Sequence, residues 1–184
     1  MNLGLCLSLI FTLGWVSMFL FRAETLWEAL PHYSGAERFW VAATPLVLSL
    51  HASASCVALT LADVTLGKAA LATAMFFTAV IVWFWGRAQI GDMLRPRLPD
   101  EPPMQLRADG VFGIVRHPLY FAYMLASAAP LLIVPHWWLL CSFAACMLAI
   151  ATRAIQEERR MHSQIGIAYA QYCNQVKRLV PWVW

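Results

Sequence analysis

Two short patterns in the second half of the chain contain residue types that can do chemistry. The first is Arg-His-Pro-Leu-Tyr at residues 116–120. Proline suits the first turn of a helix, which predicts that Arg116 and His117 stand beside a helix N-terminus. The N–H groups and positive dipole there attract anions, and Gly110 and Gly113 allow a ligand to approach the backbone closely. Arg116 by itself is equally explained as a membrane-surface anchor, and His117 as a solvated cap.

The second pattern is Arg153, Glu157 and Glu158. Residues four positions apart share a helix face, so Arg153 and Glu157 can pair. We expect this helix to end near Glu157, where acids are unfavourable beside the negative end of the helix dipole unless they pair or bind a cation. Together the two patterns predict a site for a zwitterion, with its anion at the first pattern and its cation on the carboxylates. An ordinary surface ion pair, worth under about 1 kcal/mol, explains the spacing at least as well.

The composition indicates which elements must position these residues. Of the 184 residues, 61% are hydrophobic and only 12% are charged, whereas about a quarter are charged in soluble domains. The net charge of +3 is too small to indicate nucleic-acid binding. The five cysteines are odd in number and include no Cys-x-x-Cys pair, so neither a disulfide framework nor a metal site is predicted. The chain is therefore predicted to be an all-α, polytopic membrane protein.

Stretches without Lys, Arg, Asp or Glu mark the membrane spans, since about 20 apolar residues cross the bilayer. The 36 uncharged residues between Arg116 and Arg153 are too many for one helix, and prolines near their middle predict a hairpin of two. The first span lacks the basic start of a signal peptide, so we expect it to stay in the protein as a transmembrane helix rather than to be cleaved off. His51, inside the second span, is expected to be a hydrogen-bonded packing residue. Five transmembrane helices are thus predicted, at residues 1–21, 39–62, 69–86, 118–134 and 137–157.

The basic residues predict the orientation of these helices. Five spans place 12 of the 13 Lys and Arg residues on one side and only Lys68 on the other. By the positive-inside rule the N-terminus is outside and the C-terminus cytoplasmic, although the bacterial inner membrane and the endoplasmic reticulum are not distinguished. Three N-terminal helices in residues 1–86 are predicted to precede a catalytic region in residues 87–184, which begins with a proline-rich linker at 95–103.

At the two charged patterns the sequence resembles the isoprenylcysteine carboxyl methyltransferase family and related membrane phospholipid methyltransferases. The shared order is Leu, Gly and an aromatic, then Arg-His-Pro-x-Tyr, a helical hairpin, Arg-x-x-x-Glu-Glu, and Gly-x-x-Tyr-x-x-Tyr before a basic, proline-containing end. The resemblance covers about residues 104–182 and falls on Leu106, Gly110, Val111, Phe112, Arg116, His117, Pro118, Tyr120, Arg153, Glu157, Glu158, Gly166, Tyr169, Tyr172, Arg178 and Pro181.

The resemblance implies an integral membrane enzyme that uses S-adenosylmethionine. Its cytoplasmic cofactor pocket would be formed by the loop before the fourth helix and the C-terminal segment. By position, Glu157 would hold the cofactor, Arg153 would orient the polar head of the substrate, and Glu158 would complete the catalytic group. The other cofactor-binding residues would be Gln105, Leu106, Arg107, Gly110, Phe112, His117, Pro118, Leu119 and Tyr120.

The implied reaction is carboxyl O-methylation of a lipophilic, isoprenylcysteine-like molecule. A carboxylate needs no general base, whereas an amine, as in phospholipid N-methylation, would need Glu157 or Glu158 to accept its proton. A second alternative is an NADPH-dependent sterol reductase, whose C-terminal region resembles the same Arg-His-Pro-x-Tyr pattern but which has more spans. A third is a non-catalytic membrane scaffold. We expect a lipophilic substrate and membrane lipids as partners, with no nucleic acid and no metal.

Overall fold

The computed structural model describes residues 3–29, 33, 35–90 and 106–181, and every regular element in them is helical. The main helices are α1 (Leu3–Ala29), α2 (Gly35–Leu61), α3 (Leu66–Ile90), α4 (Pro118–Ala128) and α5 (Trp137–Ile165). The shorter elements are the 3₁₀ turns η3 (Gly110–Gly113) and η4 (Ala129–Leu132) and the helix α6 (Ile167–Gln175). Within the described part, α1, α2, α3 and α5 are long and apolar enough to cross a membrane. The expected all-α architecture of a multi-pass membrane protein is confirmed at this level.

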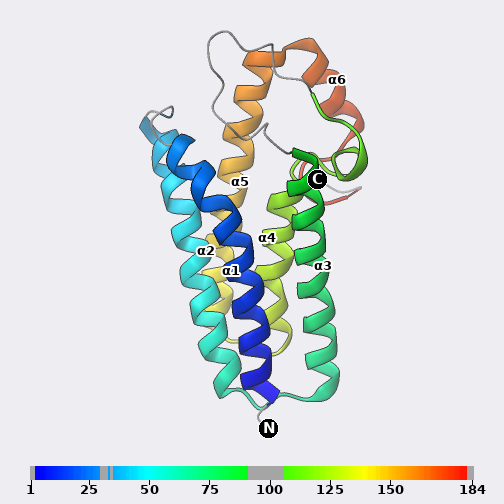
Figure 1. Ribbon diagram of the computed structural model, residues 1–184. Coiled ribbons are helices and arrows are strands. Elements are labelled where there is room, and N and C mark those ends of the chain that lie inside the picture. Colours follow the sequence, from blue (N-terminus) through cyan, green and yellow to red (C-terminus); the bar gives the residue numbers. More distant parts are fainter. Residues whose placement is uncertain (1–2, 30–32, 34, 91–105, 182–184) are drawn as a thin grey trace.

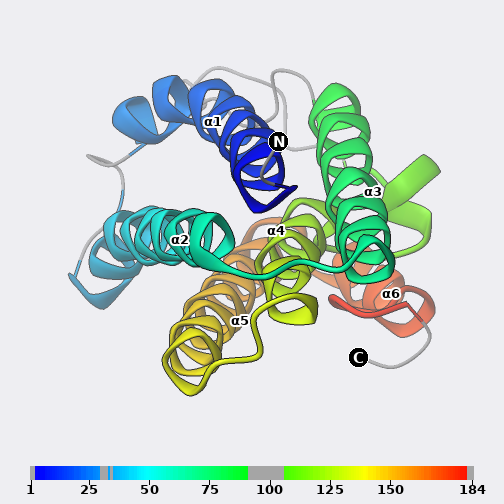
Figure 2. The ribbon, with the colours of Figure 1, turned by 90° about the horizontal axis from the view of Figure 1, so that it is seen from below.

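The helices form one bundle, with α6 at one end and the N-terminus at the other (Figure 1). Helix α2 packs against α1 and α5, and α3 packs against α4. Seen along the bundle, α4 lies near its centre (Figure 2). The connections from α2 to α3 and from η4 to α5 lie at the same end as the N-terminus, while η3 and α6 lie at the opposite end. The start of α4 and the C-terminal half of α5 therefore bring both charged patterns to that opposite end.

The fourth helix is shorter than predicted. It is α-helical only to Ala128 and continues as η4 to Leu132, because Pro130 has no N–H group for the helix ladder. The run of Pro118–Leu132 falls short of the about 20 residues that cross a bilayer. In the described residues, four helices rather than the predicted five have the length of a membrane span.

Helix α5 is longer than predicted. It continues past Glu157 to Ile165, since the intervening residues are good helix formers and the first helix-ending residue is Gly166, with φ +66°. Glu157 and Glu158 therefore lie inside the helix, and the expectation that they stand at the negative end of its dipole is wrong. Their charges must be balanced by side chains instead.

Aromatic side chains make close contacts between α1 and its neighbours. The rings of Phe11 and Phe76 stack with centroids 4.2 Å apart, and Trp15 stacks on Tyr123 of α4 at 6.1 Å. All four side chains are buried. Gly14 permits this approach, because a Cβ on it would lie 2.8 Å from Cζ of Phe76. These contacts fix α1 against α3 and α4.

His51 joins three helices inside the bundle. Its Nε2 lies 3.0 Å from the carbonyl oxygen of Ser127 in α4, and its Nδ1 lies 2.8 Å from Oγ of Ser142 in α5. The residue is buried. A neutral imidazole with its proton on Nε2 uses both ring nitrogens in these bonds, which agrees with the expected packing role.

We expect Gly14→Ala to lower the thermal unfolding midpoint in detergent. The added methyl group overlaps the buried ring of Phe76, and overpacking of this kind costs about 1–3 kcal/mol. Gly67→Ala is the matched control, because a Cβ on Gly67 would meet no atom within 4 Å. Alanine favours a helix over glycine by about 1 kcal/mol, so the control should unfold at an equal or higher temperature. A wild-type midpoint for Gly14→Ala would contradict the tight packing of α1 on α3.

Candidate functional site

The N-terminus of α4 carries the first charged pattern. Pro118 occupies the first helical position and His117 is the N-cap. The Phe121 N–H donates to the His117 carbonyl oxygen at 3.0 Å, which begins the helix ladder. The Leu119 N–H lies in the first turn, where a helix presents backbone donors to a ligand. Gly86 lets α3 pack closely here, since a Cβ on it would lie 3.3 Å from Cγ of Pro118.

Glu157 of α5 faces this terminus. Arg153 donates from Nη2 to Oε1 of Glu157 at 2.9 Å and from Nη1 to the side chain of Gln156 at 3.2 Å. The Tyr120 hydroxyl donates to the same Glu157 oxygen, and Nδ1 of His117 lies 3.7 Å from Oε2 of Glu157. The Glu157 side chain is 30% exposed, whereas that of Arg153 is 4% exposed. Glu157 is therefore an accessible carboxylate beside a buried cation.

Glu158 binds three cationic side chains. Its Oε1 lies 3.1 Å from Nη1 of Arg116, with which it forms an ion pair, and 3.3 Å from Nε2 of His117. Its Oε2 accepts from Nη2 of Arg178 at 2.6 Å. The side chain is almost fully buried, and burying an unpaired carboxylate is costly. Arg116 and His117 lie at the start of α4, and Arg178 follows α6. Glu158 therefore joins α5 to the start of α4 and to the C-terminal segment.

The C-terminal segment lies against the loop before α4. The backbone of residues 115–117 pairs in parallel with residues 177–178, with N–H to carbonyl distances of 2.8 and 3.1 Å. The Tyr172 hydroxyl of α6 donates to the carbonyl oxygen of Phe112 at 2.6 Å, and Leu106 packs against the same helix. The loop and the C-terminal segment therefore form one unit at the N-terminus of α4.

His117 is buried and contacts the carboxylates of both Glu157 and Glu158; these side chains, with Arg116, Tyr120, Arg153 and Arg178, are called the charged cluster below. Burial lowers the pKa of the imidazole, but hydrogen bonds and charge attraction from Glu157 and Glu158 outweigh it, so the net pKa is raised. Because the folded protein favours the protonated ring, His117 contributes most stability below the ordinary imidazole pKa. This contribution is lost as the pH rises through the raised value.

The side chain of Gln89 from α3 holds the η3 turn. Its Oε1 accepts from the Val111 N–H at 3.0 Å. Gly110 has φ +58°, which glycine adopts without strain, and a Cβ on it would lie 2.6 Å from Cδ of Gln89. Arg107 donates to the Gln89 carbonyl oxygen and pairs with Asp109 at 3.1 Å. The close approach that Gly110 permits is, in this structure, an approach of the protein's own side chain.

The two predicted patterns meet in space, although 32 residues separate them in the chain. The residues brought together are Arg153, Glu157, Glu158, Arg116, His117 and Tyr120, with Pro118 and Leu119 in the same helical turn. A second group contacts α3, α6 and the η3 turn instead, and consists of Leu106, Arg107, Gly110 and Phe112. Gln105 and the proline-rich linker at 95–103 lie outside the described residues. The individual roles of these residues stay predictions.

Two residues that contact the site were not predicted from any pattern in the sequence. The ring of Tyr33 has its centroid 5.5 Å from Cζ of Arg153, and Gln89 supports the η3 turn. Tyr33 lies between two helices in the chain and Gln89 lies at the end of one, so neither belongs to a spaced motif. Arg178 differs, because the basic, proline-containing end of the chain had indicated it.

Comparison with known families decides what kind of enzyme contains this cluster. The model of the isoprenylcysteine carboxyl methyltransferase (ICMT) family matches residues 70–163, slightly more than half of the chain. The chain belongs to the ICMT family. The matched residues include both charged patterns and the hairpin between them. Neither the search of curated proteins nor that of solved structures gave a match.

Membership of the ICMT family establishes the reaction. The enzyme uses S-adenosylmethionine to methylate the carboxyl group of isoprenylcysteine in a membrane. The expected methyltransferase activity, its cofactor and its isoprenylated, lipophilic substrate are thereby confirmed. Family membership therefore favours carboxyl methylation over the three alternatives, which were phospholipid N-methylation, sterol reduction and a purely structural role.

We expect Gly110→Ala to weaken S-adenosylmethionine binding by this ICMT-family enzyme several-fold. Alanine at φ +58° is strained by about 1–2 kcal/mol, and its methyl group displaces Gln89 from Val111. Gly166→Ala is the matched control, since Gly166 has φ +66° but a Cβ on it meets no atom within 4 Å. Titration with the cofactor in detergent measures the difference. Equal losses of affinity in the two variants would argue against any role of the Gln89 contact.

Proposed function

We propose that Arg153, Glu157, His117 and Tyr120 form the site where this enzyme holds its cofactor and the carboxylate of its substrate. The observation that carries the proposal is the contact network that joins these four side chains from α4 and α5. It presents a buried cation and a partly exposed anion side by side. Such a pair suits two ligands of which one bears an ammonium group and the other a carboxylate.

The residues around this network fit the amino-acid end of S-adenosylmethionine, which is a zwitterion. The Glu157 carboxylate, 30% exposed, can pair with an ammonium group. The first turn of α4 and the guanidinium of Arg116 can donate to a carboxylate, and within the described residues the buried Nε of Arg116 has no hydrogen-bond partner. We therefore assign the cofactor to the region between the loop before α4 and the C-terminal segment. Leu106, Arg107 and Phe112 would line its adenosine end.

Positioning accounts for the chemistry. S-adenosylmethionine supplies a methyl group bonded to a positively charged sulfur. Arg153 attracts the substrate carboxylate and sets its direction, because a guanidinium matches the geometry of a carboxylate. A carboxylate is already a nucleophile, so no side chain has to remove a proton, and alignment and exclusion of water lower the barrier. Glu158, which has three cationic partners, then acts by holding the surrounding side chains.

We also propose that α4 completes a fifth membrane span. It begins at the end of the bundle that carries α6, and the η4–α5 connection lies at the other end (Figure 1). Bilayers thin locally around short helices, and such thinning compensates for the short length of α4. With five spans, 12 of 13 basic residues lie on the side of the cluster, and this supports a cytoplasmic C-terminus and an outside N-terminus. Residues 87–184 would supply the catalytic region.

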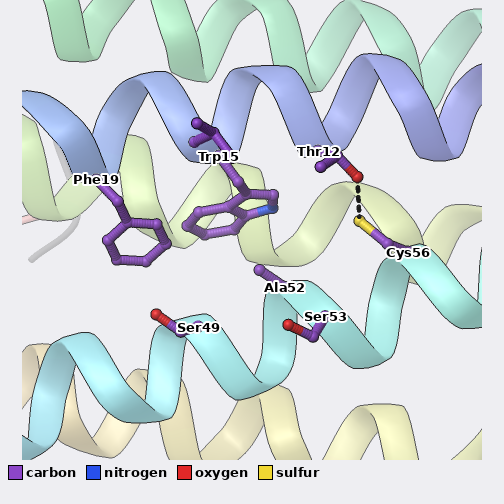
Figure 3. Close-up of a pocket in the computed structure, with 8 residues that line it drawn as sticks. Thr12, Trp15, Phe19, Ser49, Ala52, Ser53 and Cys56 are labelled. Atoms are coloured by element: carbon purple, nitrogen blue, oxygen red, sulfur yellow. Dashed lines mark hydrogen bonds between the residues drawn. The ribbon is translucent and has the colours of Figure 1, made fainter.

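A cleft between α1 and α2 suits the isoprenyl chain of the substrate. Its volume is about 360 Å³. Trp15 and Phe19 of α1 face small residues of α2 across it (Figure 3). Thr12, Val16 and Ser53, which also line the cleft, are exposed on the side of the bundle. A lipophilic chain can therefore enter sideways from the bilayer.

Aromatic contacts connect this cleft to the charged network. Phe19 and Trp15 both stack on Tyr123 of α4, with ring centroids 6.2 and 6.1 Å apart. Tyr123 lies one helical turn from Tyr120, whose hydroxyl donates to Glu157. An isoprenyl chain along this aromatic wall would leave its cysteine end beside the charged network.

We expect Glu157→Gln and Arg153→Ala to separate cofactor binding from substrate binding. Glu157→Gln removes the charge that pairs with the ammonium group, and a hydrogen bond to a charged group contributes about 1.5–3 kcal/mol, so cofactor affinity should fall at least about tenfold. Arg153→Ala should raise KM for the prenylcysteine or lower kcat while nearly preserving cofactor affinity. Cofactor titration and initial rates of labelled methyl transfer measure both. Unchanged affinity in the first variant, or an equal loss of affinity in the second, would mean that the roles are wrongly assigned.

Filling the cleft should impair long substrates most. Ala52 lies in the wall of the cleft on α2 and is buried, so we expect Ala52→Phe to raise KM more for S-farnesyl cysteine than for S-geranyl cysteine. Val57→Phe is the control, because Val57 is 59% exposed on the same helix outside the cleft. Cofactor affinity, which should not change, verifies that each variant is folded. The assignment fails if both chain lengths are affected equally or if Val57→Phe has the same effect.

A further inference from the structure

An aromatic residue from outside the region matched to the ICMT family covers the guanidinium of Arg153. Tyr33 follows α1 and precedes α2 in the chain, and its ring centroid lies 5.5 Å from Cζ of Arg153. Arg160, further along α5, has its Cζ 3.9 Å from the same centroid. Both distances are within the range of cation–π attraction. One ring therefore contacts two cations on the same helix.

An ion pair holds Arg160 in this position. Its Nε lies 2.8 Å from Oε1 of Glu37, and its Nη2 donates to Oε2 at 3.2 Å. Pairing at two points fixes the plane of the guanidinium as well as its location. Glu37 lies in the first turn of α2, four positions after Tyr33. The ion pair therefore keeps the start of α2, and Tyr33 just before it, against α5.

We propose that Tyr33 is a substrate-positioning residue that acts through Arg153, an inference that rests on the proposed role of Arg153 in binding the substrate carboxylate. The Arg153 guanidinium donates to Glu157 and Gln156, while its Cζ lies over the Tyr33 ring, 5.5 Å from the centroid. A cation held by hydrogen bonds and by an aromatic ring keeps one orientation. Covering it also limits contact with water, which strengthens its attraction for a carboxylate. Tyr33 thus determines how tightly the cysteine carboxylate is held, without contacting the cofactor.

Steady-state kinetics of the full chain with S-farnesyl cysteine test this proposal. Tyr33→Leu removes the ring, and we expect KM to rise about 2- to 30-fold, the factor that corresponds to one cation–π contact. The affinity for S-adenosylmethionine should stay at the wild-type value. Tyr33→Phe keeps the ring and should restore KM, since the interaction needs the aromatic face and not the hydroxyl group. A merely structural role would move cofactor affinity together with KM.

A variant of Glu37 tests the Tyr33–Arg153 contact through the ion pair that supports it. Glu37→Gln leaves Tyr33 in place but loosens its support through Arg160, so it should raise KM in the same direction and by a smaller factor. In an Arg153→Ala background, which lacks the cation, Tyr33→Leu should add no further rise, because both changes remove the same interaction. A double variant that shows the full effect of each change would overturn the coupling.

The failures of the two proposals can be told apart. A wild-type KM in Tyr33→Leu, or equal impairment in Tyr33→Phe, overturns the role of Tyr33 alone if Arg153→Ala still raises KM. Unchanged KM and kcat in Arg153→Ala overturn the proposed function of Arg153, and the role of Tyr33 with it. Loss of cofactor affinity in Tyr33→Leu also overturns the positioning role.

Discussion

Two adjacent carboxylates, Glu157 and Glu158, must be accommodated on one packed helix, and the rest of the site depends on how their charges are balanced. Successive residues point about 100° apart around a helix, so each acid needs cations in a different direction. Glu157 pairs with Arg153 on its own helix, whereas Glu158 pairs with Arg116 before α4 and with Arg178 after α6. An unpaired charge at such a position would destabilise the fold by several kcal/mol.

This charge balance assembles segments that are distant in sequence. Glu158 and the backbone pairing of residues 115–117 with 177–178 hold the C-terminal segment at the start of α4. His117 lies between both acids and connects the two halves of the network. Glu157 is left partly exposed, with the buried Arg153 beside it. One set of ion pairs therefore both stabilises the polar end of the bundle and shapes a site for charged ligands.

Much of this arrangement follows from where charges are absent in the sequence. Long uncharged stretches mark α1, α2, α3 and α5, and a hairpin brings His117, at the start of one helix, close to Glu157 in the C-terminal half of the next. Helix ends are less predictable, because a helix continues through polar residues until one such as Gly166 ends it. The contacts of Tyr33 and Gln89 depend on how segments outside the apolar helix interiors pack, and no periodic pattern reports that packing.

Hydrogen exchange with and without S-adenosylhomocysteine, the demethylated cofactor, tests most directly whether the charged network forms the cofactor site. Exchange rates report which backbone amides a ligand protects. We predict that the ligand slows exchange in residues 106–120 and 172–181, where the loop before α4 meets the C-terminal segment, and leaves α1 and α2 nearly unchanged. Saturating ligand that protects other segments and leaves these two unaltered would contradict the assignment.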